Sequence, residues 1–129
     1  MKDQPKTKTS YGTVTPYLIV EEAEAFQHFM EKVFQAREQY KQQEPQRGIV
    51  HAEVVIGDSV IMFAEATEQW KVSPAGMFIL VKDVEGTYQA ALKEGAVSLG
   101  EPADQSYGRS AGVVDPFGNT WWITSMPSS

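Results

Sequence analysis

The chain has 129 residues, of which 42% are hydrophobic and 22% charged, with a formal net charge of −6 and no cysteine. This length and composition are typical of one globular domain, and the lack of cysteine excludes disulfides, thiolate metal sites and a cysteine nucleophile. The acidic balance without a basic cluster argues against nucleic acid as a partner, and no apolar run approaches the about 20 residues that span a membrane.

Residues 1–10 are polar and contain no hydrophobic segment, so we expect a flexible tail of a cytoplasmic protein and not a signal peptide. The next part of the chain, residues 13–66, predicts one module made of a strand, a helix and three further strands. Residues 21–34 predict the helix, because acidic side chains fill the first turn and apolar side chains recur every three or four residues. Alternating or β-branched runs between turn residues predict the strands, at residues 13–20, 36–43, 48–56 and 60–65.

A polar linker, residues 67–75, separates this module from a second one at residues 76–125. The second module begins with a predicted strand, followed by a helix that has Asp83 as its N-cap and ends at Gly95. In this module the first strand is predicted at residues 77–81 and the short strand after the helix at residues 96–99. A loop is predicted at residues 100–107 and the closing hairpin at residues 108–125.

The two modules repeat one order of elements, β-α-β-β-β. Their closing turns also correspond, because Gly57-Asp58-Ser59-Val60 aligns with Gly118-Asn119-Thr120-Trp121. We therefore predict an α+β fold of two βαβββ modules, related by a pseudo-twofold duplication, that form a curved half-barrel sheet with helices on the outside. Each helix covers only one face of its sheet, so the uncovered concave side is expected to form a pocket.

Five short motifs follow one another along the chain: Pro16-Tyr17-Leu18, His51-Ala52-Glu53, Gly57-Asp58-Ser59, the helix start Asp83-Val84, and Asp115-Pro116-Phe117-Gly118 before Trp121. With these motifs spread over residues 13–125, the chain resembles the vicinal oxygen chelate superfamily, which includes glyoxalase I, bleomycin-resistance proteins and extradiol dioxygenases. The order of the motifs is specific for the fold and much less so for an activity. The resemblance implies a homodimer, in which pockets are often completed across the two chains.

In the metal-using members of this superfamily, four positions on the concave strands supply histidine, glutamine or glutamate ligands. By register, the resemblance places these positions near Thr15, Phe63, Met77 and Trp122. None of these side chains suits a divalent metal, which prefers imidazole, carboxylate or thiolate ligands. We therefore expect no metal and no cofactor.

His51 and Glu53 are the first candidate site residues. They lie two residues apart on one strand, so their side chains share the face that is expected to line the pocket. A histidine beside a carboxylate can transfer protons or hold a polar group of a ligand. Alternatively, the pair bonds to cross-strand neighbours or lies at a subunit contact.

Trp122 and Thr124 share a face of the last strand, where the indole offers a flat apolar surface and the hydroxyl a hydrogen bond. Alternatively, the tryptophans pack in the core or in a dimer. Arg109 suits an anionic or carbonyl-bearing ligand, although a surface salt bridge is the alternative. Trp70 in the linker either covers the pocket mouth or packs in a dimer seam. The other predicted ligand-binding residues are Tyr17, Met62, Met77, Ile79 and Tyr107.

These features favour a metal-independent small-molecule-binding protein that holds an aromatic or amphipathic ligand in an apolar cavity. The alternative is a metal-independent enzyme of lyase or isomerase type, with His51 as acid and base and Arg109 holding a ligand oxyanion. A metal-dependent glyoxalase or dioxygenase is disfavoured by the side chains at the ligand positions.

Overall fold

The computed structural model describes residues 11–127, so the predicted tail at residues 1–10 lies outside the described part. Within that range the chain forms two helices and eight strands. The first module consists of β1 (Tyr17–Val20), α1 (Ala23–Phe34), β2 (Arg37–Glu44), β3 (Gly48–Ile56) and β4 (Ser59–Glu65). The second consists of β5 (Gly76–Leu80), α2 (Val84–Lys93), β6 (Val97–Gln105), β7 (Gly108–Val114) and β8 (Thr120–Ser125).

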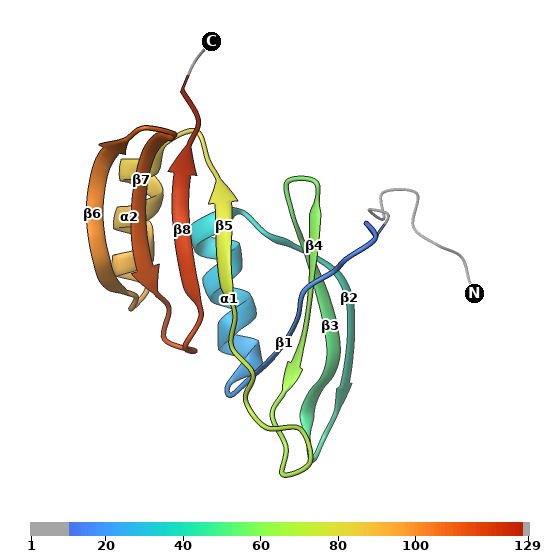
Figure 1. The fold of residues 1–129 in the computed structure, drawn as a ribbon. Coiled ribbons are helices and arrows are strands. Elements are labelled where there is room, and N and C mark those ends of the chain that lie inside the picture. The colour runs from blue at the N-terminus through green and yellow to red at the C-terminus, as the bar shows by residue number, and fades with distance from the viewer. Residues whose placement is uncertain (1–10, 128–129) are drawn as a thin grey trace.

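Each module builds its own four-stranded sheet, with strand orders β1-β4-β3-β2 and β5-β8-β7-β6 (Figure 1). In both sheets the first strand of the module pairs in parallel with the last, while the other neighbours pair antiparallel. The repeated order confirms the predicted α+β fold of two βαβββ modules. The curved sheets stay open and do not close into a barrel.

Two strands differ by more than one residue from those predicted. β1 begins at Tyr17 and not at residue 13, although the carbonyl of Pro16 still accepts a 3.0 Å hydrogen bond from the amide of Met62. β6 extends to Gln105 through the region predicted as a loop, despite Pro102. β6 is an edge strand whose register shifts on both sides of Gly100, and an edge strand tolerates a proline because one side needs no donor.

A single hydrophobic core joins the two modules. The ring of Phe34 on α1 lies 4.4 Å from the ring of Trp121 on β8, and Phe26 lies 5.5 Å from Phe117 in the last turn. Both helices, together with one face of each sheet, contribute to this core. Consequently the helices lie between the two sheets and not on the outside of one curved sheet as predicted, and the opposite face of each sheet is left without a covering element (Figure 1).

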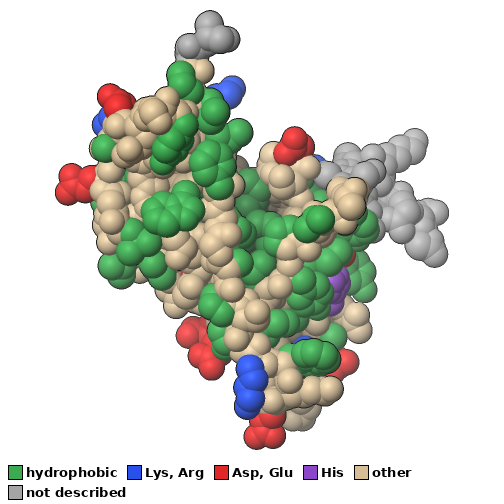
Figure 2. Space-filling model, in the orientation of Figure 1, with side chains coloured by type: hydrophobic (Ala, Val, Ile, Leu, Met, Phe, Trp, Pro, Cys, Tyr) green, Lys and Arg blue, Asp and Glu red, His purple; other side chains and the backbone are tan. Residues whose placement is uncertain are grey.

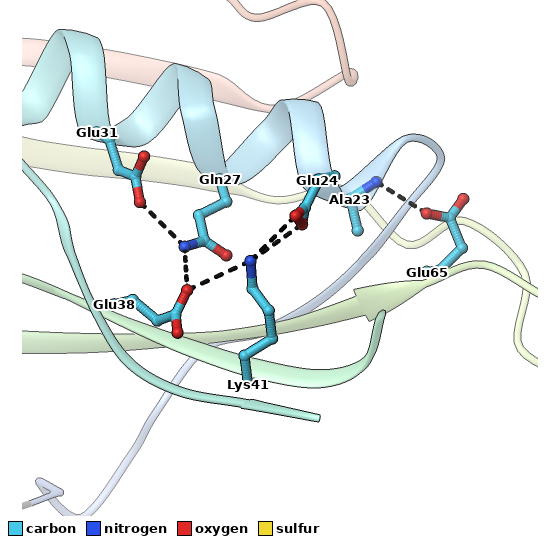
Figure 3. Close-up of polar contacts among 7 residues, drawn as sticks. All are labelled: Ala23, Glu24, Gln27, Glu31, Glu38, Lys41 and Glu65. Carbon is cyan, nitrogen blue, oxygen red and sulfur yellow. Dashed lines mark hydrogen bonds and ion pairs between the residues drawn. The ribbon is translucent and has the colours of Figure 1, made fainter. Parts of the chain in front are cut away.

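The start of α1 is capped from a distant strand. The amides of Glu22 and Ala23 donate to the Glu65 carboxylate over 3.0 and 2.9 Å, and no side chain of the helix start itself provides a cap. Further along the helix, Gln27 donates to Glu31 and Glu38, and Lys41 of β2 bridges Glu24 and Glu38 (Figure 3). These bonds fix α1 to β2 and to the end of β4.

In the described residues, no helix has the length and apolar character needed to cross a membrane.

Candidate functional site

The uncovered face of the first sheet carries a row of side chains that crosses all four strands. Tyr17 pairs with Met62, Met62 with Glu53, and Glu53 with Tyr40. His51 lies two residues before Glu53 on β3, so its side chain is on the same face of the sheet. We call the face formed by Tyr17, Tyr40, His51, Glu53 and Met62 the polar sheet face.

His51 lies at the centre of the hydrogen bonds on the polar sheet face. Its Nε2 atom is 2.9 Å from Oε2 of Glu53, and its Nδ1 atom is 3.1 Å from the Tyr17 hydroxyl. The imidazole also contacts the rings of Tyr17 and Tyr40, with centroids 5.4 and 5.9 Å apart. Both ring nitrogens are therefore engaged by protein groups, one on the same strand and one on β1.

Glu53 is a buried carboxylate, 4% exposed, that is held from several sides. The hydroxyl of Tyr11 lies 2.8 and 2.9 Å from its two oxygens, and Nε2 of Gln39 donates over 3.1 Å. Burial raises the pKa of Glu53, but the hydrogen bonds from His51, Gln39 and Tyr11 lower it by more, so its pKa lies below the ordinary value. The polar sheet face thus contains a fixed negative charge at neutral pH.

Tyr11 and Gln39 were not predicted to belong to the site. Tyr11 precedes the first strand and reaches Glu53 across 42 residues of sequence. Gln39 falls where the register of β2 shifts between Glu38 and Tyr40. A bulge changes the face on which a side chain lies, and no local sequence signal announces it here.

The uncovered face of the second sheet is apolar. Trp122 pairs with Phe78 of β5 on one side and with Gly112 of β7 on the other. The indole ring lies so close to Gly112 that a Cβ atom added to this glycine would be 2.5 Å from Cζ3 of Trp122. The large side chains of this face are between 46% and 67% exposed, and hydrophobic groups gather over this sheet in Figure 2. We call this surface the apolar sheet face; it consists of Phe78, Leu80, Val97, Leu99 and Trp122.

Met77 and Ile79, which were expected beside Trp122, lie on the opposite side of β5. They pair with Trp121 and Ile123, two buried core residues, so they face the helices. The reason is the alternation of strand side chains, which gives the Trp122 side to Phe78 and Leu80. The interpretation that places Met77 and Ile79 around Trp122 is therefore wrong.

Arg109 also lies on the helix side of its sheet, and not beside Trp122 as a pocket residue would. It lies two residues before the core residue Ala111 on β7, so both side chains are on the same face of the sheet. Its guanidinium pairs with Glu85 of α2 and with Asp104 of β6. The salt-bridge alternative therefore describes Arg109.

The other predicted residues of the second module are dispersed. Thr124 is completely buried, and its hydroxyl lies 2.9 Å from that of Ser110, so this hydroxyl already has a partner. Tyr107 is half exposed at the turn between β6 and β7, and Trp70 is exposed in the linker.

A groove of about 780 Å³ separates the two modules. Its walls include β5, the hairpin between β3 and β4, the segment before β1 and the end of α1, and Met77 and Ile79 are among the lining residues. Figure 2 shows this recess with hydrophobic side chains at its walls. The groove lies beside the core and is lined by both faces of β5, so it borders the apolar sheet face at Phe78 and Leu80. It does not join the two uncovered faces into the expected pocket. Within one chain these faces do not meet, because the helices lie between the sheets (Figure 1).

The residues at the positions implied for metal ligands do not fit a metal. Phe63 is completely buried in the core, Met77 packs against the core, and Trp122 presents an indole. Glu65, the nearest carboxylate on β4, caps α1. Among residues 11–127 no group of three histidine, aspartate or glutamate side chains is placed to hold a metal ion.

Comparisons with known proteins agree with this architecture. The sequence profile described as "Glyoxalase/Bleomycin resistance protein/Dioxygenase superfamily" matches residues 11–123. An uncharacterised protein of Mycobacterium bovis, Mb0911c, is 29% identical over 120 residues, which cover 84% of this chain and 79% of the relative.

Two solved structures have similar folds. TioX from Micromonospora sp. ML1 has a TM-score of 0.73 and 21% identity, with 92% of this chain and 99% of TioX covered. TnmS3, an antibiotic binding protein from Streptomyces sp. CB03234, has a TM-score of 0.71 and 16% identity, with 92% and 98% covered.

Proposed function

Because the chain belongs to the glyoxalase/bleomycin resistance protein/dioxygenase superfamily, we propose that it is a small-molecule-binding protein that holds an aromatic or amphipathic ligand without a metal. The observation that carries this proposal is the position of Trp122. Its ring lies against Gly112 on a sheet face with no covering element, and it remains 46% exposed. A rigid indole plane among aliphatic side chains is a suitable surface for a flat ligand.

The two sheet faces offer complementary chemistry. The apolar sheet face supplies dispersion and stacking, while the polar sheet face supplies tyrosine hydroxyls around a fixed carboxylate. An amphipathic molecule between such faces would satisfy both of its ends. TnmS3, the antibiotic-binding protein of similar fold, supports a binding function for this architecture by analogy.

We propose that a second copy of the chain brings the two faces together. Members of this superfamily commonly form dimers, and an exposed group of five large apolar side chains is unusual on a monomer surface. In a twofold dimer, the apolar sheet face of one chain would lie opposite the polar sheet face of the other, so each dimer would hold two sites. The ligand would then contact residues of both chains.

Metal independence is supported by the chemistry of the donors. Binding through stacking and hydrogen bonds needs no cation, and the indole, thioether and aromatic groups at the implied ligand positions do not bind the divalent metals of this superfamily. A metal-dependent member would need at least two carboxylate or imidazole ligands where this chain has Phe63 and Trp122.

Titration with 8-anilinonaphthalene-1-sulfonate, an amphipathic aromatic probe, tests the proposal. We expect saturable binding that Trp122→Ala weakens about tenfold, which corresponds to the loss of one stacking partner. Trp70→Ala is the matched control, since Trp70 is also exposed but lies in the linker, and it should leave the affinity unchanged.

Dialysis against a chelator tests whether ligand binding is independent of a metal. The dialysed protein should bind the probe with unchanged affinity. Loss of binding that is restored by zinc, nickel, manganese or iron would overturn metal independence. In the titration, equal affinities of Trp122→Ala and the parent protein for the probe would overturn the assignment of Trp122 to the binding site.

A further inference from the structure

We infer that Tyr17 is the proton-exchanging group of the polar sheet face, and that Glu53 and His51 are positioning residues that act through it. The inference rests on the proposed function, since a ligand must lie on this face to meet Tyr17. It differs from the expectation that His51 itself exchanges protons with the ligand.

The hydrogen bonds fix the protonation of the imidazole. The Glu53 carboxylate has a pKa below its ordinary value and is therefore an acceptor, so Nε2 of His51 must carry a proton. In the neutral imidazole, Nδ1 is then an acceptor, and its only partner in the described residues is the Tyr17 hydroxyl at 3.1 Å. Tyr17 accordingly donates its proton toward His51.

The arrangement has the order carboxylate, imidazole, hydroxyl. A buried acid that orients an imidazole, which in turn accepts the proton of a hydroxyl, is one means by which proteins activate a hydroxyl oxygen as a nucleophile or base. Here the carboxylate is 4% exposed, the imidazole is partly buried, and the phenol is 47% exposed. Only the last group is open to a ligand, because both nitrogens of His51 have partners.

The proton transfer can be written in balanced form. When a ligand with a weakly acidic O–H or C–H reaches Tyr17, the phenol proton passes to Nδ1 of His51 as the ligand proton passes to the phenol oxygen. The products are a ligand anion, a neutral Tyr17 and an imidazolium that is paired with Glu53. The reverse transfer restores the starting state, and no oxidant or further reactant is needed.

The charged and titratable groups around this chain of bonds come from three elements. Glu53 lies on β3, Tyr40 on β2 and Tyr11 in the segment before β1, and the hydroxyl of Tyr11 contacts both oxygens of Glu53. Arg37 of β2 pairs with Val55, two residues beyond Glu53. Tyr11 and Gln39 fill the acceptor positions of Glu53, so the carboxylate is directed at His51 and not at the ligand.

The structure contains two matched comparison tyrosines. Tyr40 is 46% exposed and contacts the same imidazole through its ring, but in the described part of the chain no hydrogen bond joins its hydroxyl to His51. Tyr107 is 49% exposed and lies in the second module. These two phenols therefore match Tyr17 in exposure and lack its bond to the base.

Acylation by N-acetylimidazole, followed by peptide mapping with mass spectrometry, tests the inference on the ligand-free protein. We expect Tyr17 to react about tenfold faster than Tyr40 and Tyr107 in the parent protein. The excess should disappear in His51→Gln, which keeps a polar side chain but no base, and in Glu53→Gln, which no longer imposes the required tautomer. The rates of Tyr40 and Tyr107 should not change.

Equal rates for Tyr17, Tyr40 and Tyr107 in the parent protein would overturn the inference, and so would an excess that persists in both variants. The parent measurement needs no substitution, so a variant that fails to fold does not prevent a decision. Because no ligand is used, a negative result here leaves the binding titration of Trp122→Ala unaffected, and the two proposals fail separately.

Discussion

The indole nitrogen of Trp121 donates a 2.8 Å hydrogen bond to Oδ2 of Asp115, and both residues are almost completely buried. The same carboxylate accepts from the amides of Phe117 and Asn119 and from the Asn119 side chain. One buried carboxylate thus accepts hydrogen bonds from the closing turn and from Trp121, the largest aromatic residue of the core. This carboxylate therefore links the closing turn to the core side chain of β8.

We therefore predict that Asp115→Ala lowers the free energy of unfolding by about 3 kcal/mol, because several buried donors lose their acceptor together. Urea denaturation measures the change. Asp58→Ala, in the corresponding turn of the first module, is the control. Asp58 is exposed, and within residues 11–127 its carboxylate accepts one hydrogen bond, from Ser59, so the change should stay within about 0.5 kcal/mol. Equal changes in the free energy of unfolding for the two substitutions would show that the buried hydrogen bonds of Asp115 do not stabilise the fold.

Gly112→Ala should weaken probe binding without unfolding the protein. A methyl group at this position would lie 2.5 Å from the Trp122 ring, and the half-exposed indole can move away from the sheet. We expect an affinity loss of about fivefold in the 8-anilinonaphthalene-1-sulfonate titration and a nearly unchanged melting temperature. Gly100→Ala is the matched control on the neighbouring strand, because no atom lies within 4 Å of the added carbon.

Glu65→Ala should destabilise the protein by about 1–2 kcal/mol, because the first turn of α1 loses its only described cap. Thermal or urea unfolding checks the value. The neighbouring Glu68 is exposed, so Glu68→Ala should change stability far less. A small effect of Glu65→Ala would show that water replaces the carboxylate at the helix start.

The contribution of Glu53 to stability should vanish in acid. Its pKa is lower in the folded state than the ordinary value of 4.5, so the ionised form is favoured by folding. This stabilisation is complete above the unfolded pKa and is lost as the pH falls through the folded pKa. The difference in unfolding free energy between the parent and Glu53→Gln should therefore be constant near neutral pH and shrink below about pH 4.5. A difference that grows in acid would contradict the lowered pKa.

A mixture of two binding-deficient variants should regain probe binding if each site spans two chains. Tyr17→Asp disables the polar sheet face and Trp122→Ala the apolar one, so each homodimer lacks intact sites. After unfolding and joint refolding, half of the dimers are mixed and half of their sites combine two intact faces, which restores about a quarter of the sites. Light scattering confirms the dimer, and a mixture that binds no better than either variant would argue against the shared site.

Sequence patterns were sufficient for the duplicated modules. The apolar stripe of α1, the N-cap Asp83 and the turn at Asp115 report local preferences that a short segment can satisfy by itself. The two strand errors have opposite signs. At residues 13–16 the sequence predicts a strand, but the ladder with β4 begins only at Tyr17. At residues 100–105 it predicts a loop, but pairing with β7 extends β6 through this region despite Pro102.

The sequence by itself determined the number and order of the elements, the shared face of His51 and Glu53, and the lack of ligand side chains at the implied metal positions. Only the tertiary structure decided that Tyr11 and Gln39 hold Glu53, that Arg109 faces α2, and that Phe78 and not Met77 lies beside Trp122. The physical reason is that periodicity fixes which side chains alternate within one strand. Which of the two alternating sets faces the helix depends on register, on bulges and on contacts between residues far apart in the chain.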